Sequence, residues 1–199
     1  MSPVFDLGKV LVHFDFSIAA RKLATRAKCS AEAPQRFIDH SPLLCRYETG
    51  LIHKEQFYKE VCAGTGYAGH LDEFCHTFSD IFAPIDPMIQ LHARLRARKV
   101  PTYIFSNTND LAVAHIRKEF PFFAHFDGYV FSFEHHVMKP HAGLYEAVEI
   151  MTGRKGSRIL YLDDRLDNIE AGRARGWQTI HHHDPAESIG IVERLGLLG

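Results

Sequence analysis

The alternation of short apolar runs with helical patterns is the feature that most constrains the fold of this chain. The apolar runs lie at residues 3–12, 100–106, 128–133, 158–162 and 177–181. They are rich in β-branched and aromatic residues, as is typical of parallel strands buried on both faces. Helical spacing of apolar residues follows at 110–120, 140–151, 166–175 and 184–195. Strands that alternate with helices predict an α/β fold, with helices on both sides of a parallel sheet.

The connection between the first two runs is much longer than an ordinary crossover. It extends from residue 13 to residue 99, whereas a crossover needs roughly a dozen residues. Within it we predict no good strand, and we predict helices at 17–26, from residue 30, at 42–48, 53–63, 71–82 and 86–99. The simplest organisation is a core of residues 1–15 and 84–199, with residues 16–83 inserted as a helical cap.

Composition narrows the functional classes. The net charge is −1, with acidic and basic residues mixed along the chain, so we expect no nucleic-acid face and no basic membrane-surface helix. The N-terminus has no signal-peptide pattern, and no apolar stretch approaches transmembrane length. We therefore expect a cytoplasmic protein. The four cysteines share no C-x-x-C spacing and are expected to be reduced thiols. The sequence gives no indication of the oligomeric state.

Polar side chains follow the predicted strands at the points where the strands end. They are Asp6, Ser106-Asn107, Lys139 in the loop after the third run, and Asp163-Asp164. In open α/β sheets, ligands bind outside the carboxyl ends of the strands, so we expect these groups to meet in one site. Two adjacent carboxylates at a buried strand end repel each other unless a cation compensates. A hard divalent ion with oxygen ligands, most simply Mg²⁺, is the natural partner.

Each cluster also has a purely structural interpretation. Asp6 could be a turn residue before Gly8, and the segment 106–110 is rich in residues that cap helices. Lys139 could be a solvated surface lysine, and Asp167-Asn168 could only cap the following helix. The shared position of the clusters, rather than any one of them, favours the functional interpretation.

The ordered set of motifs, together with the inserted helices, resembles the haloacid dehalogenase-like hydrolase superfamily, in its helical-cap subclass. The resemblance covers essentially the whole chain and implies a Rossmann-like parallel sheet core with an inserted α-helical cap. Most members are phosphatases with an aspartate nucleophile. The segment Phe5-Asp6-Leu7-Gly8, followed by Val10-Leu11-Val12-His13-Phe14-Asp15-Phe16, is also similar to sugar-phosphate phosphatases related to glucose-1-phosphate phosphatase.

The resemblance implies a role for each motif. Asp6 and Lys139 would be catalytic, with Asp6 attacking phosphorus to form an aspartyl-phosphate. The groups expected to bind the phosphoryl group are Leu7, Gly8, Ser106, Asn107 and Lys139. Mg²⁺ would be held by Asp6, the main-chain carbonyl of Gly8 and Asp164, with Asp163 bound directly or through water. The implied reaction is Mg²⁺-dependent hydrolysis of a small phosphorylated metabolite, with sugar phosphates among the candidates.

Gly8 departs from the family pattern. The usual residue there is a second aspartate that moves protons, which typically contributes about 10²–10⁴-fold to the rate. His13 is one alternative proton carrier. Two other functions stay open: a hydrolytic 2-haloacid dehalogenase, which needs no metal and leaves Asp163-Asp164 unexplained, and a non-catalytic phospho-ligand-binding protein on a degenerate site.

Overall fold

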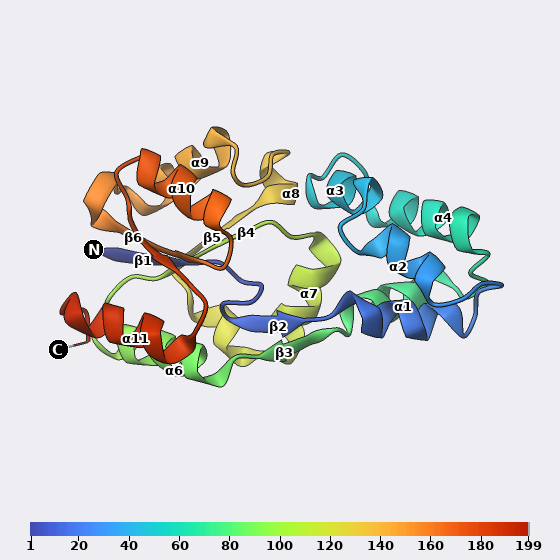
Figure 1. Ribbon diagram of the computed structural model, residues 1–199, viewed down its shortest axis with the longest axis horizontal. Helices are drawn as coiled ribbons and strands as arrows, with labels where there is room; N and C mark the ends of the chain where they lie inside the picture. Colours follow the sequence, from blue (N-terminus) through green and yellow to red (C-terminus); the bar gives the residue numbers. More distant parts are fainter. Residues whose placement is uncertain (199) are drawn as a thin grey trace.

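The computed structural model describes residues 1–198, with a sheet and its helices at one end and a helical bundle at the other (Figure 1). The strands are β1 (Ser2–Phe5), β2 (Val12–Phe14), β3 (Phe82–Pro84), β4 (Tyr103–Ser106), β5 (Gly128–Phe131), β6 (Ile159–Asp163) and β7 (Gln178–His181). The α-helices are α1 (Phe16–Ala24), α2 (Glu32–Ile38), α3 (Pro42–Glu48), α4 (Lys54–Thr65), α5 (Leu71–Ser79), α6 (Asp86–Ala97), α7 (Asp110–Glu119), α8 (Ser132–His135), α9 (Ala142–Thr152), α10 (Leu166–Ala174) and α11 (Pro185–Arg194).

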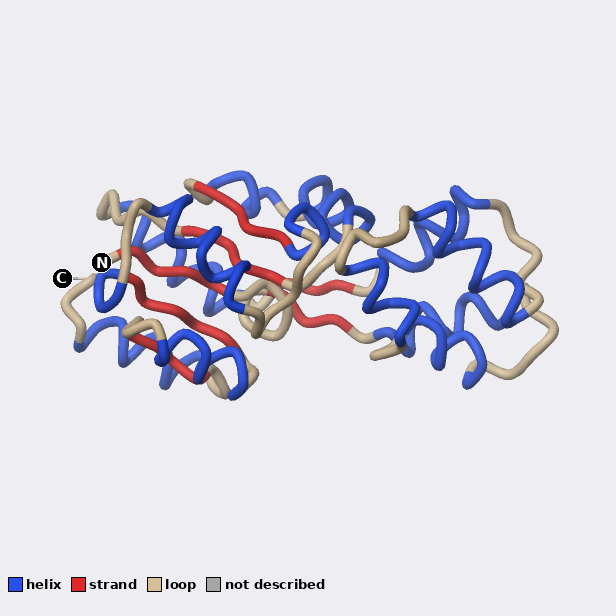
Figure 2. Tube along the Cα trace, turned by 90° about the horizontal axis from the view of Figure 1, so that it is seen from above, coloured by secondary structure: helices blue, strands red, loops and turns tan. Residues whose placement is uncertain are grey.

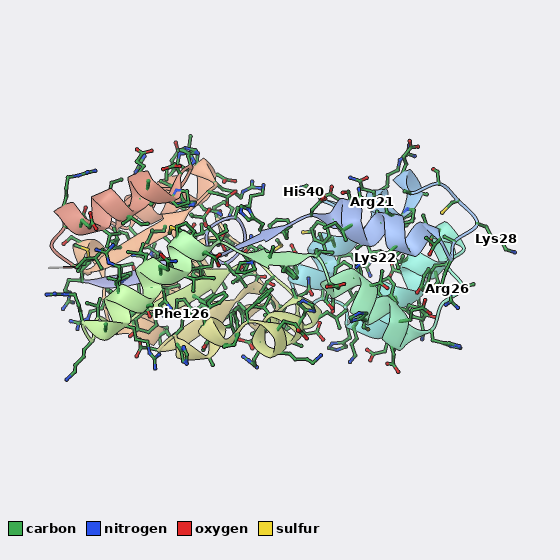
Figure 3. All side chains as sticks on the ribbon, turned by 90° about the horizontal axis from the view of Figure 1, so that it is seen from below. Arg21, Lys22, Arg26, Lys28, His40 and Phe126 are labelled. Carbon is green, nitrogen blue, oxygen red and sulfur yellow. The ribbon has the colours of Figure 1, made fainter. Side chains whose placement is uncertain are left out.

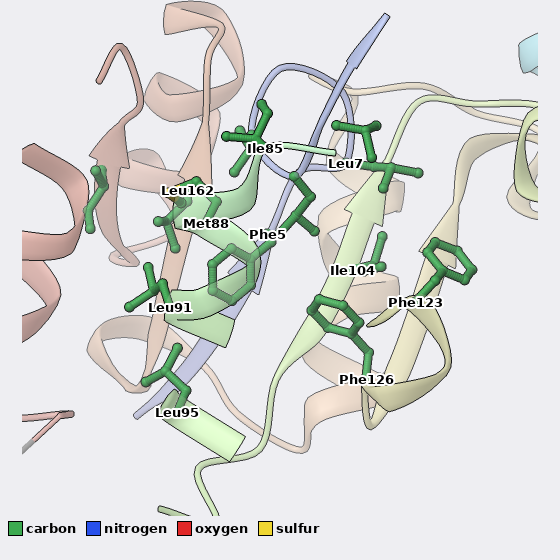
Figure 4. Close-up of a cluster of buried hydrophobic side chains, with 14 of the residues drawn as sticks. Phe5, Leu7, Ile85, Met88, Leu91, Leu95, Ile104, Phe123, Phe126 and Leu162 are labelled. Carbon is green, nitrogen blue, oxygen red and sulfur yellow. The ribbon is translucent and has the colours of Figure 1, made fainter. Parts of the chain in front are cut away.

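The main sheet has five parallel strands in the order β5-β4-β1-β6-β7. Successive side chains of a strand point to opposite faces, and the three central strands use this alternation to build two cores. Val4, Phe105 and Tyr161 pack with α9 and α10, whereas their neighbours Phe5 and Leu162 pack with α6, α7 and α11. Figure 4 shows the second core, where α6 lies against β1 and β6. The predicted parallel sheet with helices on both faces is confirmed.

The prediction of one strand over residues 3–12 is wrong in its second half. β1 ends at Phe5, and the chain turns back on itself, with the N–H groups of Leu11 and Val12 both donating to the Leu7 carbonyl at 2.9 and 3.0 Å. Lys9 has a φ of +59°, which a continuing strand does not allow. Leu7, Val10 and Leu11 are buried in the core. An apolar run indicates burial, and burial here belongs to a compact turn.

The long connection also contains a strand that the sequence did not indicate. β3 pairs antiparallel with β2, so that a two-stranded ribbon leads out of the sheet and back (Figure 2). The predicted helix 71–82 consequently stops at Ser79. The five helices between the ribbon strands have their own hydrophobic cluster, centred on Phe57, Phe74 and Phe78. A separate core fits our proposed division into residues 16–83 as cap and residues 1–15 with 84–199 as core.

Several helix ends differ from the predictions. α1 begins at Phe16, one residue before the predicted start, and is capped by Asp15, which accepts the Ser17 N–H at 2.8 Å. α4 continues past Gly64 and ends at Gly66, whose φ is +69°. α9 begins after Pro140, with His141 as the N-cap. Each difference is a matter of one or two residues, because several neighbouring residues can serve as the cap of a helix.

Basic side chains gather at the outer end of the helical bundle, on α1 and the turn after it; Arg21, Lys22, Arg26 and Lys28 lie there in Figure 3. Acidic residues partly neutralise them, since Lys22 pairs with Asp80 at 2.7 Å and Arg26 with Glu73 at 2.9 Å. None of the four cysteines in the bundle forms a disulfide within the described chain, and Cys45 is exposed. No helix among residues 1–198 has both the length and the apolar character needed to cross a bilayer.

Candidate active site

Three neighbouring strands carry the predicted site residues at their carboxyl ends. Asp6 directly follows β1, while Ser106 and Asp163 are the last residues of β4 and β6. These strands are adjacent in the sheet, so the three side chains lie close together although they are far apart in the sequence. Lys139 reaches the same place from the loop between α8 and α9. The structure thus brings together all four predicted clusters.

Lys139 lies at the centre of this group. Its Nζ is 3.0 Å from Asp6 Oδ1 and 2.7 Å from Asp163 Oδ2, and it donates to the Phe105 carbonyl at 3.0 Å. Its side chain is only 1% exposed, which excludes the interpretation as a solvated lysine. Burial alone would lower the pKa of Lys139, but the charges of Asp163 and Asp6 outweigh it and raise the pKa. Lys139 is therefore a permanent cation here.

Asp6 keeps one oxygen atom free. Its Oδ1 accepts the Leu7 main-chain N–H at 2.7 Å and faces Lys139, whereas Oδ2 makes no hydrogen bond within residues 1–198. Burial raises the pKa of Asp6 to about 7; Lys139 opposes this shift, and the negative charges of Asp163 and Asp164 reinforce it. A buried carboxylate with a free oxygen is available to attack an electrophile or to bind a cation.

The two adjacent aspartates differ in their surroundings. Asp163 is fully buried and accepts hydrogen bonds from Lys139, the Tyr161 hydroxyl, the Arg165 N–H and the Asn168 amide. Burial would raise the pKa of Asp163, but Lys139 outweighs it, so the pKa is lowered. Asp164 has one weak partner, Lys9 Nζ at 3.8 Å, and burial together with Asp163 raises its pKa.

The segment after β4 combines binding and structural groups. Ser106 is buried, and its hydroxyl has only a long contact of 3.3 Å to the Asn107 carbonyl. The Asn107 side chain accepts the Lys139 N–H at 2.8 Å and donates to the Lys139 carbonyl at 3.1 Å, and its second amide N–H has no partner within residues 1–198. Asn109 caps α7 by accepting the Ala112 N–H at 2.9 Å. The Asn107 side chain therefore positions Lys139, and its second amide N–H, together with its main chain, is left for a ligand.

Gly8 lies against an aromatic ring. A Cβ atom on residue 8 would be 2.7 Å from Cε1 of Phe14, so the Phe14 ring occupies the space that an aspartate side chain would need. His13, on the same ribbon, is exposed and does not line the cavity. The structure gives no support to His13 as the alternative proton carrier.

The site opens into a cavity of about 210 Å³. Its floor is made by Asp6, Ser106, Lys139 and Asp164. Its walls combine an apolar part, lined by Phe14, Phe16, Leu44, Phe78, Ile81, Phe82, Ala112 and Met138, with polar side chains, among them His40, Glu48, Ser79, Thr108, Asn109 and Arg165. Residues from α3, α5 and the ribbon contribute to these walls. The helical bundle therefore closes over the carboxyl end of the sheet.

Three further residues belong to the site, and sequence reasoning did not assign them a role there. Tyr161 and Asn168 hold the Asp163 carboxylate, and Glu48 lines the cavity from the end of α3. Asn168 lies in the first turn of α10, five residues after Asp163, where a capping role was the structural alternative. The buried Oδ1 of Asn168 has no partner within residues 1–198. Nothing local in the sequence distinguishes Glu48 from other glutamates of the bundle.

A divalent cation fits this group of residues. Asp6, Asp163 and Asp164 each offer a carboxylate oxygen, and these oxygens lie within 4.8 Å of one another. Lys139 supplies one buried positive charge against three negative ones, and Lys9, which is exposed, makes only a long contact of 3.8 Å to Asp164. The remaining negative charge and the all-oxygen donor set suit Mg²⁺.

Comparisons with known proteins agree with this geometry. A protein-family model described as haloacid dehalogenase-like hydrolase matches residues 4–176. The chain belongs to this family. It is a hydrolase, and the resemblance drawn from its motifs is confirmed. A sesquiterpene phosphatase of Aspergillus oryzae is 24% identical to this hydrolase over 188 residues, which cover 91% of the chain and 89% of the relative.

Solved structures share the fold. A haloacid dehalogenase family enzyme of Bacteroides thetaiotaomicron, in complex with magnesium and inorganic phosphate, matches the hydrolase with a TM-score of 0.79 at 20% identity, covering 92% of this chain and 93% of that one. The L-2-haloacid dehalogenase of Xanthobacter autotrophicus matches less well, with a TM-score of 0.65 at 16% identity, covering 89% and 75%. The predicted fold, a Rossmann-like sheet with inserted helices, is therefore confirmed.

Proposed function

We propose that this hydrolase is a Mg²⁺-dependent phosphatase that cleaves a small phosphomonoester through an aspartyl-phosphate on Asp6. The observation that carries the proposal is the group of three carboxylates around one buried lysine, at the floor of a cavity. This group offers a free nucleophilic oxygen, Asp6 Oδ2, beside a fixed positive charge. Transfer of a phosphoryl group needs little more than positioning and the neutralisation of charge.

Each residue at the floor of the cavity has a role in the proposed reaction. Asp6 Oδ2 attacks phosphorus, and Lys139 neutralises charge that develops on the phosphoryl oxygens. The Ser106 hydroxyl and the main-chain N–H of Asn107 are free to donate to a phosphoryl oxygen. Water then hydrolyses the aspartyl-phosphate and restores Asp6.

Mg²⁺ would be held by Asp6, the Gly8 carbonyl and Asp164, and when bound it would supply further charge neutralisation. Asp163 already accepts from four donor groups, which favours contact with the ion through water. Its main role in this proposal is to hold Lys139. The Bacteroides enzyme, which has the same fold, was solved with magnesium and phosphate, and this supports the assignment.

The cavity walls favour an apolar alcohol as the leaving group. A sugar presents hydroxyl groups that need hydrogen-bond partners, and leaving such groups unpaired costs about 1–3 kcal/mol each. Phenylalanine rings form part of the wall. Phe14 and Phe16 lie edge to face with their centroids 5.6 Å apart, and the Phe16 and Phe78 rings are tilted, with their centroids 5.9 Å apart. The name of the Aspergillus relative, a sesquiterpene phosphatase, points in the same direction. We therefore prefer the monophosphate of a compact apolar alcohol to the sugar phosphate suggested by the motifs.

The assay measures phosphate release from 4-nitrophenyl phosphate, benzyl phosphate and glucose 1-phosphate, with Mg²⁺ or with EDTA, beside halide release from 2-chloropropionate. We expect phosphate release only with Mg²⁺, and none from Asp6→Asn. The kcat/KM for benzyl phosphate should be at least about tenfold above that for glucose 1-phosphate. A benzyl group is larger than two methylene groups, whose burial already contributes about 1.6 kcal/mol. Halide release in EDTA would establish the dehalogenase instead. Binding of phosphate without turnover would establish the non-catalytic alternative.

A further inference from the structure

The proposed reaction leaves one proton without a donor. When the bond between phosphorus and the leaving oxygen breaks, that oxygen has to be protonated to leave as an alcohol. Gly8 has no side chain, and Phe14 fills the space beside it. Lys139 is held by Asp6 and Asp163. The donor therefore has to come from another wall of the cavity.

Glu48 is the carboxyl group on the opposite wall. It is the last residue of α3 and lines the same cavity as Asp6. Two other acidic residues of the bundle are paired with basic ones, Glu60 with Arg46 at 2.9 Å and Asp80 with Lys22 at 2.7 Å. The Glu48 carboxyl group makes no ion pair or hydrogen bond within residues 1–198, although the residue is partly buried.

An unpartnered carboxyl group in such a place favours its neutral form. Burial, and secondarily the negative charge of Asp6, raise the pKa of Glu48 to about 7. A carboxylic acid of this kind can both donate a proton and take one back near neutral pH. The neighbouring cavity residue His40 is exposed, with its Nε2 3.5 Å from Asp39.

The main chain of Glu48 is anchored to the phosphate-binding side of the cavity. The Ser132 hydroxyl donates to the Glu48 carbonyl at 2.6 Å and accepts the Thr108 N–H at 2.9 Å. The preceding residue, Tyr47, donates its hydroxyl proton to Asp110 at the start of α7. Figure 1 shows α3 beside α8, where the helical bundle meets the sheet half. These contacts fix Glu48 relative to the segment that follows β4.

We propose that Glu48 is the proton donor and acceptor of this hydrolase, supplied by the helical bundle in place of the aspartate missing at position 8. The proposal rests on the phosphatase function proposed above. In the first step Asp6 Oδ2 bonds to phosphorus, the leaving oxygen takes the electron pair of the broken bond, and Glu48 gives it a proton. In the second step Glu48 takes a proton from water as the water oxygen bonds to phosphorus. Asp6 is released as a carboxylate, and inorganic phosphate leaves.

The test compares esters that differ in their need for a proton. Glu48→Gln keeps the shape of the side chain and removes its acidity. For benzyl phosphate, an alkyl ester, kcat/KM should fall about 10²–10⁴-fold, whereas for 4-nitrophenyl phosphate it should fall less than about tenfold. The ratio of the two rates on one preparation does not depend on how much of the variant is folded. Equal losses on both esters, or no loss on either, would overturn the proposal.

A second readout addresses the water step. Loss of the base slows hydrolysis of the aspartyl-phosphate, so Glu48→Gln should release a rapid burst of 4-nitrophenol, close to one equivalent per enzyme, before a slow steady state. The matched control is Glu55→Gln, an exposed glutamate on α4 that does not line the cavity; it should stay within about twofold of the wild type. A burst-free Glu48→Gln that has lost activity contradicts the second step.

His40→Asn tests the competing cavity residue (His40 lies between the two halves of the molecule in Figure 3). If this variant, and not Glu48→Gln, loses the alkyl ester selectively, the donor is His40 and the proposal is wrong. If the wild type releases no phosphate from either ester with Mg²⁺, the phosphatase function itself has failed. That outcome is distinct from an active wild type that tolerates Glu48→Gln.

Discussion

Replacing Lys139 with methionine tests whether this side chain holds the candidate site together. Methionine has a similar length and an apolar character, so the main change is the loss of the positive charge. The Nζ contacts at 3.0 Å to Asp6 and 2.7 Å to Asp163 disappear, between side chains that are 11% and 0% exposed. Breaking a buried ion pair leaves an uncompensated charge and typically costs about 3–5 kcal/mol. We expect Lys139→Met to lower the free energy of unfolding by that amount in EDTA.

The destabilisation should also depend on pH, and its sign follows from the pKa of Asp6. Burial and the neighbouring carboxylates already raise that pKa to about 7, and Lys139 opposes the shift, so the variant should raise it further. An acid whose folded-state pKa exceeds its unfolded value binds more protons when folded. The variant should therefore lose most stability at pH 8 and recover part of it at pH 5.5, always relative to the wild type at the same pH.

Urea unfolding, followed by the fluorescence of the single tryptophan Trp177, measures both effects. Lys118→Met is the matched control, because Lys118 pairs with Glu119 at 2.9 Å on the surface, with 82% and 45% of the side chains exposed. Such pairs contribute about 0–1 kcal/mol. If Lys139→Met costs no more than Lys118→Met at pH 8, or if its relative cost grows at pH 5.5, the electrostatic argument is refuted.

Three further changes probe other parts of the structure. Asp164→Ala should abolish Mg²⁺ binding in a calorimetric titration, while its melting temperature in EDTA should not fall, because a repulsive carboxylate is removed; a lower melting temperature would contradict this account. Gly8→Ala should destabilise by about 1–3 kcal/mol, since its Cβ would lie 2.7 Å from the Phe14 ring, and a Phe14→Leu background should relieve most of the cost in urea unfolding. Burial lowers the pKa of His92 to about 4, so only the unfolded state binds its proton between pH 6.5 and 4. Stability should fall by up to roughly 3 kcal/mol as the pH drops through that window, and a His92→Gln variant with the same pH slope would refute the assignment.

Local sequence patterns were sufficient to predict many of the strands and helices of the core. The strands at β4 to β7 and the helices between them follow from short apolar runs and helical spacing, which depend on neighbouring residues alone. The positions of Asp6, Ser106, Lys139 and the pair Asp163-Asp164 at strand ends follow in the same way, because charged and polar residues interrupt apolar runs where a strand leaves the core. The rule that ligands bind at the carboxyl ends of such strands then placed these groups in one site.

The prediction failed where one pattern has two structural outcomes. Leu7, Val10 and Leu11 are buried in a turn, and burial in a turn cannot be distinguished from burial in a strand by composition. The segment at β3 is a strand only because β2 lies beside it, about seventy residues away in the sequence. Both segments depend on a partner that no local window contains.

The sequence by itself determined the order of the elements, the family and the identity of the charged groups that meet at the sheet, because each of these is written in residues close to one another along the chain. Only the tertiary structure decided what surrounds those groups. It placed the Phe14 ring where the side chain of residue 8 would be, and it brought further phenylalanine rings and Glu48 into the lining of the cavity. These are contacts between a core and an inserted bundle that pack through their own side chains, and such packing is set by shape and volume in three dimensions.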